Sequence, residues 1–169
     1  MNAPLFASAV ALAVLATACS KDSRAATRPS GDPGAAPSAA DCSHSACGHD
    51  FFIDAAPSAG CAVGATCTVS LTLVATGAFH INDEYPYKFR ADDAAGVQFL
   101  GSGSAGKNVF SKDVGDWRKK DEKTGTMTVR FRPTAAGGKT IGGVFKLSVC
   151  SEQSCQLEQQ QVSTSVVVK

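Results

Sequence analysis

Apolar side chains at every second position restrict the fold of this chain more than any other feature. Val69, Leu71 and Leu73 alternate with the polar residues Thr68, Ser70 and Thr72. The same pattern returns in residues 127–132 and 144–150. Side chains two apart lie on the same face of a β-strand, whereas a helix needs a period near 3.6. The alternation therefore predicts strands with one buried and one solvated face.

Turn residues divide the rest of the chain into similar short segments. Residues 107–123 are polar with scattered apolar side chains, and they predict a long loop with one helical turn; Gly137-Gly138 predicts a turn. Without an amphipathic helix, some seven to eight short strands predict an all-β fold, an antiparallel immunoglobulin-like β-sandwich. The strands are expected over residues 51–53, 67–75, 78–82, 87–91, 97–100, 127–133, 144–150 and 162–168.

The first nineteen residues predict an export signal. An uncharged apolar run from Leu5 to Ala18 is too short to span a bilayer and ends in small residues. Its end, Leu15-Ala16-Thr17-Ala18-Cys19, resembles a bacterial lipobox, which implies cleavage before Cys19 and lipid on that residue. An ordinary signal peptide cut nearby is the alternative. We expect an exported protein, lipid-anchored in the bacterial cell envelope and facing the periplasm or the cell surface.

Two further segments follow the signal. Residues 20–41 are rich in Ala, Ser, Pro and Gly without periodic apolar positions, which predicts a flexible linker because such a segment buries too little surface to offset its ordering entropy. Residues 42–169 form the predicted folded domain.

Six cysteines in the predicted domain fall into three close pairs. Export allows them to form disulfides, since thiols are kept reduced mainly in the cytoplasm. The simplest connectivity is local and pairs Cys42 with Cys47, Cys61 with Cys67, and Cys150 with Cys155.

The first pair lies among histidines, which raises a metal site as an alternative. Cys42, His44, Cys47 and His49 supply the thiolate and imidazole ligands that suit zinc or copper. Their spacing matches none of the common zinc patterns, in which a loop of about a dozen residues separates two ligand pairs. We favour a structural disulfide and predict no resident metal or other cofactor.

The last pair, Cys150 and Cys155, has four residues between its members, at the end of a predicted strand. A disulfide closing so short a loop stabilises the fold by only about 2 kcal/mol on chain-entropy grounds. Such a bond can be reduced without unfolding the domain. The spacing is compatible with both a structural staple and an exchangeable pair.

Two segments resemble the N-terminal periplasmic domain of the thiol:disulfide interchange protein DsbD. They are Gly77-Ala78-Phe79-His80-Ile81-Asn82 and the cysteine pair before a closing Val-rich strand, and the resemblance covers residues 51–169. It implies that Cys155 forms a mixed disulfide, that Cys150 resolves it, and that Phe110 caps the pair. The implied partners are thioredoxin-like or periplasmic thiol/disulfide proteins. We interpret His80 and Asn82 as structural polar residues that share one sheet face.

These observations give two main functional hypotheses. The first is thiol:disulfide exchange or electron relay through Cys150 and Cys155; the second is a non-enzymatic binding or structural lipoprotein with three structural disulfides. A zinc- or copper-binding protein is a weaker third. The chain has sixteen Lys and Arg residues and fifteen Asp and Glu residues. It therefore lacks the net positive charge that would attract nucleic acid. No Gly-x-Ser-x-Gly, phosphate-binding glycine loop or His-Glu-x-x-His motif suggests a hydrolase.

Overall fold

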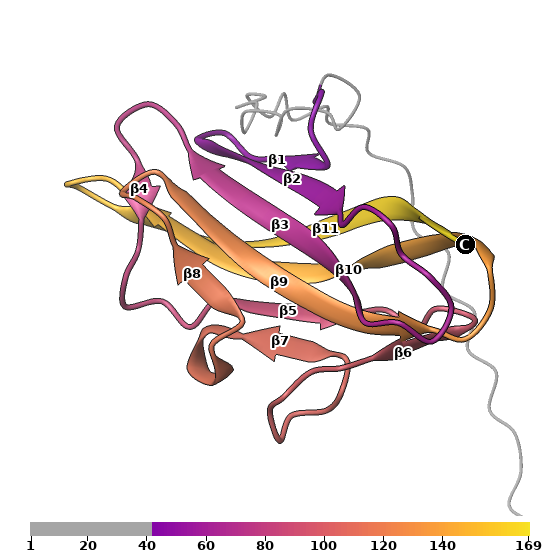
Figure 1. Cartoon of the computed structure of the whole chain (residues 1–169). Coiled ribbons are helices and arrows are strands. Elements are labelled where there is room, and N and C mark those ends of the chain that lie inside the picture. The colour runs from indigo at the N-terminus through magenta and orange to yellow at the C-terminus, as the bar shows by residue number, and fades with distance from the viewer. Residues whose placement is uncertain (1–41) are drawn as a thin grey trace, which may run out of the picture. The chain divides into compact units, whose positions relative to one another are not determined.

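Two antiparallel sheets packed face to face make up the part of the chain that the structure describes (Figure 1). The structure is a computed structural model and describes residues 42–169. The predicted export signal 1–19, with Cys19, and the predicted linker 20–41 lie outside the described residues. The antiparallel β-sandwich of immunoglobulin-like type predicted from the alternation is confirmed.

The first sheet has six strands. Its strands run in the order β1-β2-β3-β9-β6, and β8 pairs with part of β9. The bounds are β1 Ala46–Cys47, β2 Phe51–Pro57, β3 Cys67–Ala75, β6 Val97–Phe99, β8 Trp117–Lys119 and β9 Thr124–Pro133.

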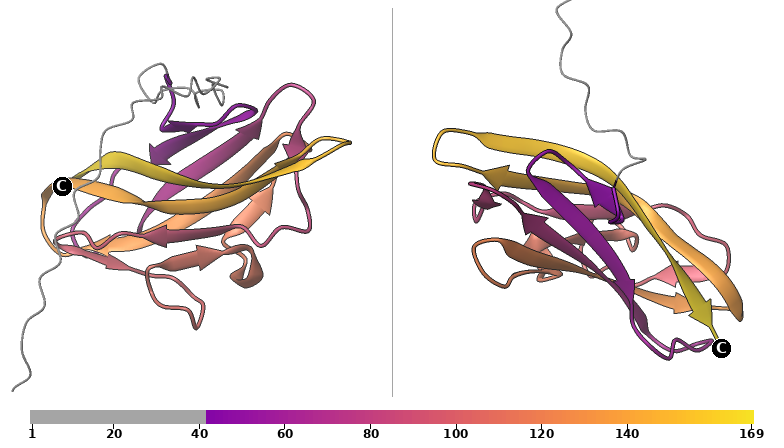
Figure 2. Two further views of the ribbon diagram at one scale, coloured as in Figure 1. Left: turned by 180° about the vertical axis from the view of Figure 1, so that it is seen from behind. Right: turned by 90° about the horizontal axis from the view of Figure 1, so that it is seen from above.

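The second sheet has five strands. Its order is β11-β10-β5-β7, and β4 pairs with the end of β10. The two longest strands of the domain, β10 and β11, form one continuous hairpin ribbon along this sheet (Figure 2). The bounds are β4 His80–Ile81, β5 Lys88–Ala91, β7 Val109–Ser111, β10 Gly137–Cys150 and β11 Cys155–Val168.

The core lies between the sheets and contains the apolar half of each alternating pattern. Val69, Leu71 and Leu73 of β3 are buried, as predicted. They face aromatic side chains of the second sheet, among them Phe89 and Phe145, whose rings meet edge to face. Burying a side chain of this size stabilises the fold by about 1.5–3 kcal/mol. Removal of this apolar surface from water is what holds the two layers together.

The segment 107–123 is more regular than the sequence predicts. It contains strands β7 and β8, with a 3₁₀ turn over Lys112–Val114 between them. The predicted helical turn is therefore present and residues 107–108, 115–116 and 120–123 lie in loops, but the prediction missed the two strands. Each strand has three residues, which is too short for an alternating pattern to show in the sequence. Tertiary burial of Phe110 and Trp117 decides the local structure instead.

Strands β10 and β11 each begin seven residues earlier than predicted. The predicted turn at Gly137-Gly138 is wrong, because both glycines already pair with the end of β11. In β11 the missed half is Gln-rich, and its inward side chains are only partly buried. A strand at a sheet edge can be polar on both faces, and it then leaves no alternation to detect. The described residues contain no helix that is long and apolar enough to cross a membrane.

Candidate functional site

All six cysteines of the described domain are paired in disulfides. The bonds join Cys42 to Cys47, Cys61 to Cys67, and Cys150 to Cys155. This is the local connectivity that the spacing predicts. Each bond closes a loop of a few residues, so each fixes one local segment and none links the two sheets.

The Cys150–Cys155 disulfide forms the last rung of the β10–β11 ribbon. The two residues lie directly opposite each other, and their Cα atoms are 4.0 Å apart. Ser151 N–H donates to the Ser154 carbonyl at 2.8 Å and closes the hairpin beyond them. In an antiparallel ladder, hydrogen-bonded pairs alternate with non-hydrogen-bonded pairs, whose Cα atoms are closer together. Cys150 and Cys155, next to the hydrogen-bonded Ser151 and Ser154, are a pair of the second kind. The strand geometry thus brings these two cysteines together.

The two ends of this disulfide differ in their exposure. Cys150 is 6% exposed, whereas Cys155 is exposed on the edge strand. On the far side of β10, Cys150 pairs with His80 of β4. Its sulfur lies 4.0 Å from the hydroxyl of Ser148. An incoming thiol would therefore meet the sulfur of Cys155 first.

Ser148 lies where the sheet beside β10 is interrupted. β4 pairs with the end of β10 and β5 with its middle, so the segment between β4 and β5 leaves the sheet beside Ser148. Side chains from that segment replace the missing ladder. Tyr87 Oη donates to the Ser148 carbonyl at 2.7 Å, and Asn82 Nδ2 donates to Ser148 Oγ at 3.4 Å. Burial raises the pKa of the Tyr87 phenol well above its usual range.

Phe110, expected over the cysteine pair, lies elsewhere in the structure. It is fully buried in β7 and packs edge to face on Phe99 with ring centroids 6.4 Å apart. Its register partner Phe89 lies opposite Phe145 of β10. Phe145 is five residues before Cys150, which is about 17 Å along a strand. The structure thus places Phe110 in the core, two strands away from β10, and not beside the disulfide.

His80 and Asn82 lie at the same end of the second sheet as the disulfide. Asn82 Oδ1 accepts the backbone N–H of Glu84 at 2.9 Å, which fixes the turn after β4. The Asn82 amide thus bonds to both Glu84 and Ser148, and it serves as a structural polar group. His80 is half-buried next to Cys150.

The four metal-ligand candidates near the start of the domain do not form a metal site. The disulfide uses both sulfurs, Cys42 and Cys47. His44 stacks on Phe52 at 3.9 Å and pairs with Asp54 at 2.8 Å. The described residues hold no group of three or more His, Cys, Asp or Glu side chains that could hold a metal ion.

His49 takes part in a small polar contact that reaches the second sheet. Its ring nitrogen Nδ1 lies 2.7 Å from Asp50 Oδ2, which also accepts a hydrogen bond from Gln156 of β11. The bond to His49 lowers the pKa of the Asp50 carboxyl; desolvation opposes this effect and Gln156 supports it. The contact ties the start of β2 to the edge strand of the other sheet.

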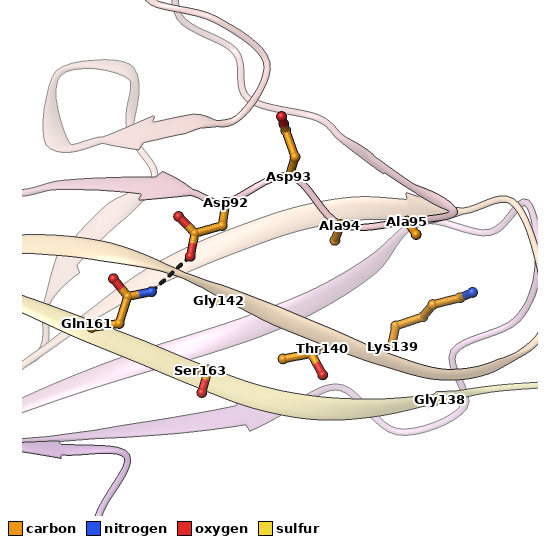
Figure 3. A pocket seen from close by; sticks show the side chains of 10 residues that line it. All are labelled: Asp92, Asp93, Ala94, Ala95, Gly138, Lys139, Thr140, Gly142, Gln161 and Ser163. Atoms are coloured by element: carbon orange, nitrogen blue, oxygen red, sulfur yellow. Dashed lines mark hydrogen bonds between the residues drawn. The ribbon is translucent and has the colours of Figure 1, made fainter. Parts of the chain in front are cut away.

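A polar groove of about 440 Å³ crosses the other end of the second sheet (Figure 3). One wall is the segment after β5, held by the Asp92 N–H donating to the Gly142 carbonyl at 2.9 Å. Gln161 Nε2 donates to Asp92 Oδ2 at 2.8 Å across the groove. Carboxylate, ammonium, hydroxyl and amide groups line it, from Asp92, Asp93, Lys139, Thr140, Gln161 and Ser163.

Sequence reasoning did not find the groove residues or the Tyr87–Ser148 contact. The groove is assembled from β10, β11 and the segment after β5, and none of these carries a local motif. The sequence does contain one local signal of the interruption beside β10, the Tyr85-Pro86 step, because proline is excluded from a central ladder position.

Comparison with known proteins gives a likeness in fold but no family. No protein-family profile and no curated protein matches the chain. A cohesin module from a Clostridium perfringens family 33 glycoside hydrolase aligns with a TM-score of 0.45 and 9% identity, over 70% of this chain and 96% of the module. AggA, the major subunit of Escherichia coli aggregative adherence fimbriae type I, aligns with a TM-score of 0.34 and 11% identity, over 71% and 96%. Likenesses this weak carry no inference about function.

Proposed function

We propose that this chain is a non-enzymatic binding domain of the bacterial cell envelope in which all three disulfides are structural. The observation that supports this most is the position of Cys150–Cys155 as the closing rung of the longest hairpin. Phe110, the aromatic residue expected to cap this bond, is buried in the core against Phe99 instead. Cys150 is buried in the sheet, where a disulfide serves to hold the strand ends together.

The groove beside Asp92 is the proposed ligand site. Gly138 and Gly142 of β10 line the groove without side chains, so a ligand can reach the backbone of β10. Two carboxylates and two hydroxyls provide more acceptors than the single ammonium group of Lys139 can satisfy. These groups suit a small polar ligand rich in hydroxyl or amine donors.

The disulfide part of the proposal is tested by redox chemistry. We expect the Cys150–Cys155 pair to have a reduction potential below about −300 mV, the range of structural disulfides. The wild-type disulfide should trap no mixed disulfide with a reduced thioredoxin-like protein that lacks its resolving cysteine. The double variant Cys150→Ser/Cys155→Ser should fold and lose about 2 kcal/mol of stability. A potential near −200 mV together with a trapped mixed disulfide would overturn the structural role.

The groove is tested by a ligand screen. Chemical shifts of the backbone amides would be followed while mono- and oligosaccharides and short amines are added. The proposal expects shifts confined to residues 92–95, 138–142 and 161–163. Asp92→Asn/Asp93→Asn should weaken binding at least tenfold, whereas Asp113→Asn, an exposed change elsewhere, should leave it unaltered. A ligand whose shifts lie on another face would contradict the groove.

Thiol:disulfide exchange is the second candidate function, favoured by the exposure of Cys155 against the burial of Cys150. In that reaction a thiolate of a reduced thioredoxin-like partner attacks Sγ of Cys155, and the Cys150 sulfur leaves with the electron pair. The partner's second thiolate then attacks the partner sulfur that is bonded to Cys155, and Cys155 leaves as a thiolate. The partner ends as a disulfide, and this chain ends as a dithiol. The same redox experiment decides between the two functions.

Envelope anchoring through Cys19 is part of the proposal and rests on the sequence Leu15 to Cys19. Cells that produce the chain with a labelled fatty acid should incorporate label into it, and Cys19→Ala should abolish the incorporation. An unlabelled wild-type chain would instead indicate an ordinary signal peptide.

A further inference from the structure

The outer edge of β11 is a long row of backbone groups that β10 does not use. Ser151 N–H donates to the Ser154 carbonyl, so Ser154 is in a hydrogen-bonded pair with β10's end. Hydrogen-bonded pairs alternate along an antiparallel ladder, so even-numbered β11 residues bond to β10. The N–H and C=O groups of odd-numbered β11 residues therefore point away from β10. Lys169 confirms this orientation at the far end. Its N–H donates to the Cys61 carbonyl at 3.0 Å, and its carbonyl accepts Val63 N–H at 3.1 Å, both on the outer side.

Between these two ends the outward backbone groups make no hydrogen bond within the described residues, although β1 and β2 of the first sheet lie beside β11. Within residues 42–169, β10 is the only strand paired with β11. No turn or loop hydrogen bond of this region reaches the backbone of residues 157–167. An open edge of this length is a template for another strand. Figure 2 shows the hairpin of β10 and β11, whose closed end extends beyond the neighbouring strands.

The edge lacks most of the features that usually prevent strands from pairing. The register with β10 is continuous from Gly137–Val168 to Cys150–Cys155, so no bulge bends β11 away. The strand has no proline, and its one charged residue, Glu158, lies opposite buried Leu147 and so faces inward. Gln160 Nε2 donates to this carboxylate at 3.4 Å and satisfies part of its hydrogen-bonding capacity. The outward face of β11 carries no charge at all.

Two exposed apolar side chains identify the partner strand. Leu157 and Val167 are 68% and 72% exposed, the two highest values among the large apolar side chains of the described domain. Both lie on the outward face of β11, at equal distances on either side of Val162. A two-fold antiparallel pairing centred on Val162 therefore places Leu157 of one copy opposite Val167 of the other.

The residues between these two also match in that register. Gln159 lies opposite Ser165, and Gln161 opposite Ser163, so amides meet hydroxyls and no like charges meet. All of these residues have odd numbers, and each opposing pair can exchange two backbone hydrogen bonds. A symmetric arrangement of this kind is the requirement for an interface between two identical subunits.

We propose that two copies of this chain associate through antiparallel pairing of their β11 strands over residues 157–167. The second sheets of the two copies then form one continuous sheet. Leu157 and Val167 become cross-strand neighbours, which shields both from water. If the groove is the ligand site proposed above, its Gln161 and Ser163 lie at the two-fold axis, and the two grooves lie next to each other.

Analytical ultracentrifugation of the full chain over a range of concentrations tests the pairing. We expect a reversible monomer–dimer equilibrium. Ser163→Pro removes an outward N–H without breaking a bond to β10, and should raise the dimer dissociation constant at least tenfold. Leu157→Lys/Val167→Lys should do the same because charge opposes strand pairing at an edge.

The control is Val114→Lys, which puts the same charge on an exposed valine of the 3₁₀ turn, away from β11. It should leave the dimer intact, and circular dichroism should show that every variant is folded. A chain that remains monomeric at all concentrations would overturn the proposal. A dimer that survives both edge variants would also overturn it, because the contact would then lie on another surface.

Discussion

A single hydroxyl completes the sheet where its ladder is interrupted. Tyr87 is fully buried, and its Oη donates to the Ser148 carbonyl, which has no strand partner on that side of β10. A buried carbonyl without a donor costs about 1–3 kcal/mol. The Tyr87 side chain therefore substitutes for a backbone N–H.

Removal of that hydroxyl should be costly. We expect Tyr87→Phe to lower the free energy of unfolding by about 1–3 kcal/mol, since it leaves the Ser148 carbonyl buried without a donor. Urea unfolding followed by circular dichroism measures this. Tyr85→Phe is the matched control, because Tyr85 is only half-buried and donates no hydrogen bond in the described structure. Equal losses in the two variants would contradict the role given to Tyr87.

The same phenol should make the domain sensitive to alkali. Burial raises the pKa of Tyr87 above its ordinary value of 10.0, because the folded state favours the neutral phenol. The associated stability is fully present below about pH 10 and is lost as pH rises towards the folded-state pKa. Unfolding free energies measured between pH 8 and 11 should stay level and then fall. In Tyr87→Phe this decline should be shallower.

At the scale of elements, β8 is held against β9 by a ring lying over a glycine. A Cβ atom added to Gly125 would overlap the Trp117 ring, so this strand position has room only for hydrogen. The close approach lets the indole cover β9 and reach Tyr87, on which it stacks with centroids 4.1 Å apart.

This contact predicts a contrast between two glycines. Gly125→Ala should destabilise the domain by about 1–3 kcal/mol, as overpacked core substitutions do. Gly138→Ala should be neutral or slightly stabilising, because no atom lies within 4 Å of its added Cβ. Thermal denaturation of both variants measures the difference. Equal melting temperatures would show that the ring moves aside without cost.

Strands β3 and β11 differ in how well the sequence predicts them. β3 alternates along its whole length and is buried on one side, and its bounds are those expected from the sequence. The first half of β11 could not be found, because Gln156, Glu158 and Gln160 face inward but are only partly buried. Hydrophobic patterning reflects burial, so it gives no signal where both faces of an edge strand contact water.

The candidate site was predictable only in part. Local spacing was enough to pair Cys150 with Cys155, since close cysteines at a strand end meet across a hairpin. Phe110 was assigned by resemblance, and a position along the chain does not determine which sheet neighbour a side chain meets. The groove depends on three separate segments that only the folded topology brings together.

At the scale of the whole molecule, most strand pairs join distant parts of the chain. Cys67 pairs with Phe131, and Ile81 of β4 pairs with Val149. Closing such large loops comes before their contacts can stabilise the chain, so sandwiches of this kind fold slowly. We expect folding with intact disulfides to take milliseconds to seconds, measured by stopped-flow circular dichroism. A submillisecond phase that recovers all of the native signal would contradict this.

Trp117 is the only tryptophan of the chain, and it lies between the layers. It is 7% exposed, stacked on Tyr87, and its ring centroid is 5.9 Å from that of Phe145 in the opposite sheet. Its ultraviolet emission therefore comes from one known point in the interior. The protein contains its own optical probe of the spacing between the sheets, and separation of the layers can be followed by fluorescence without any attached dye.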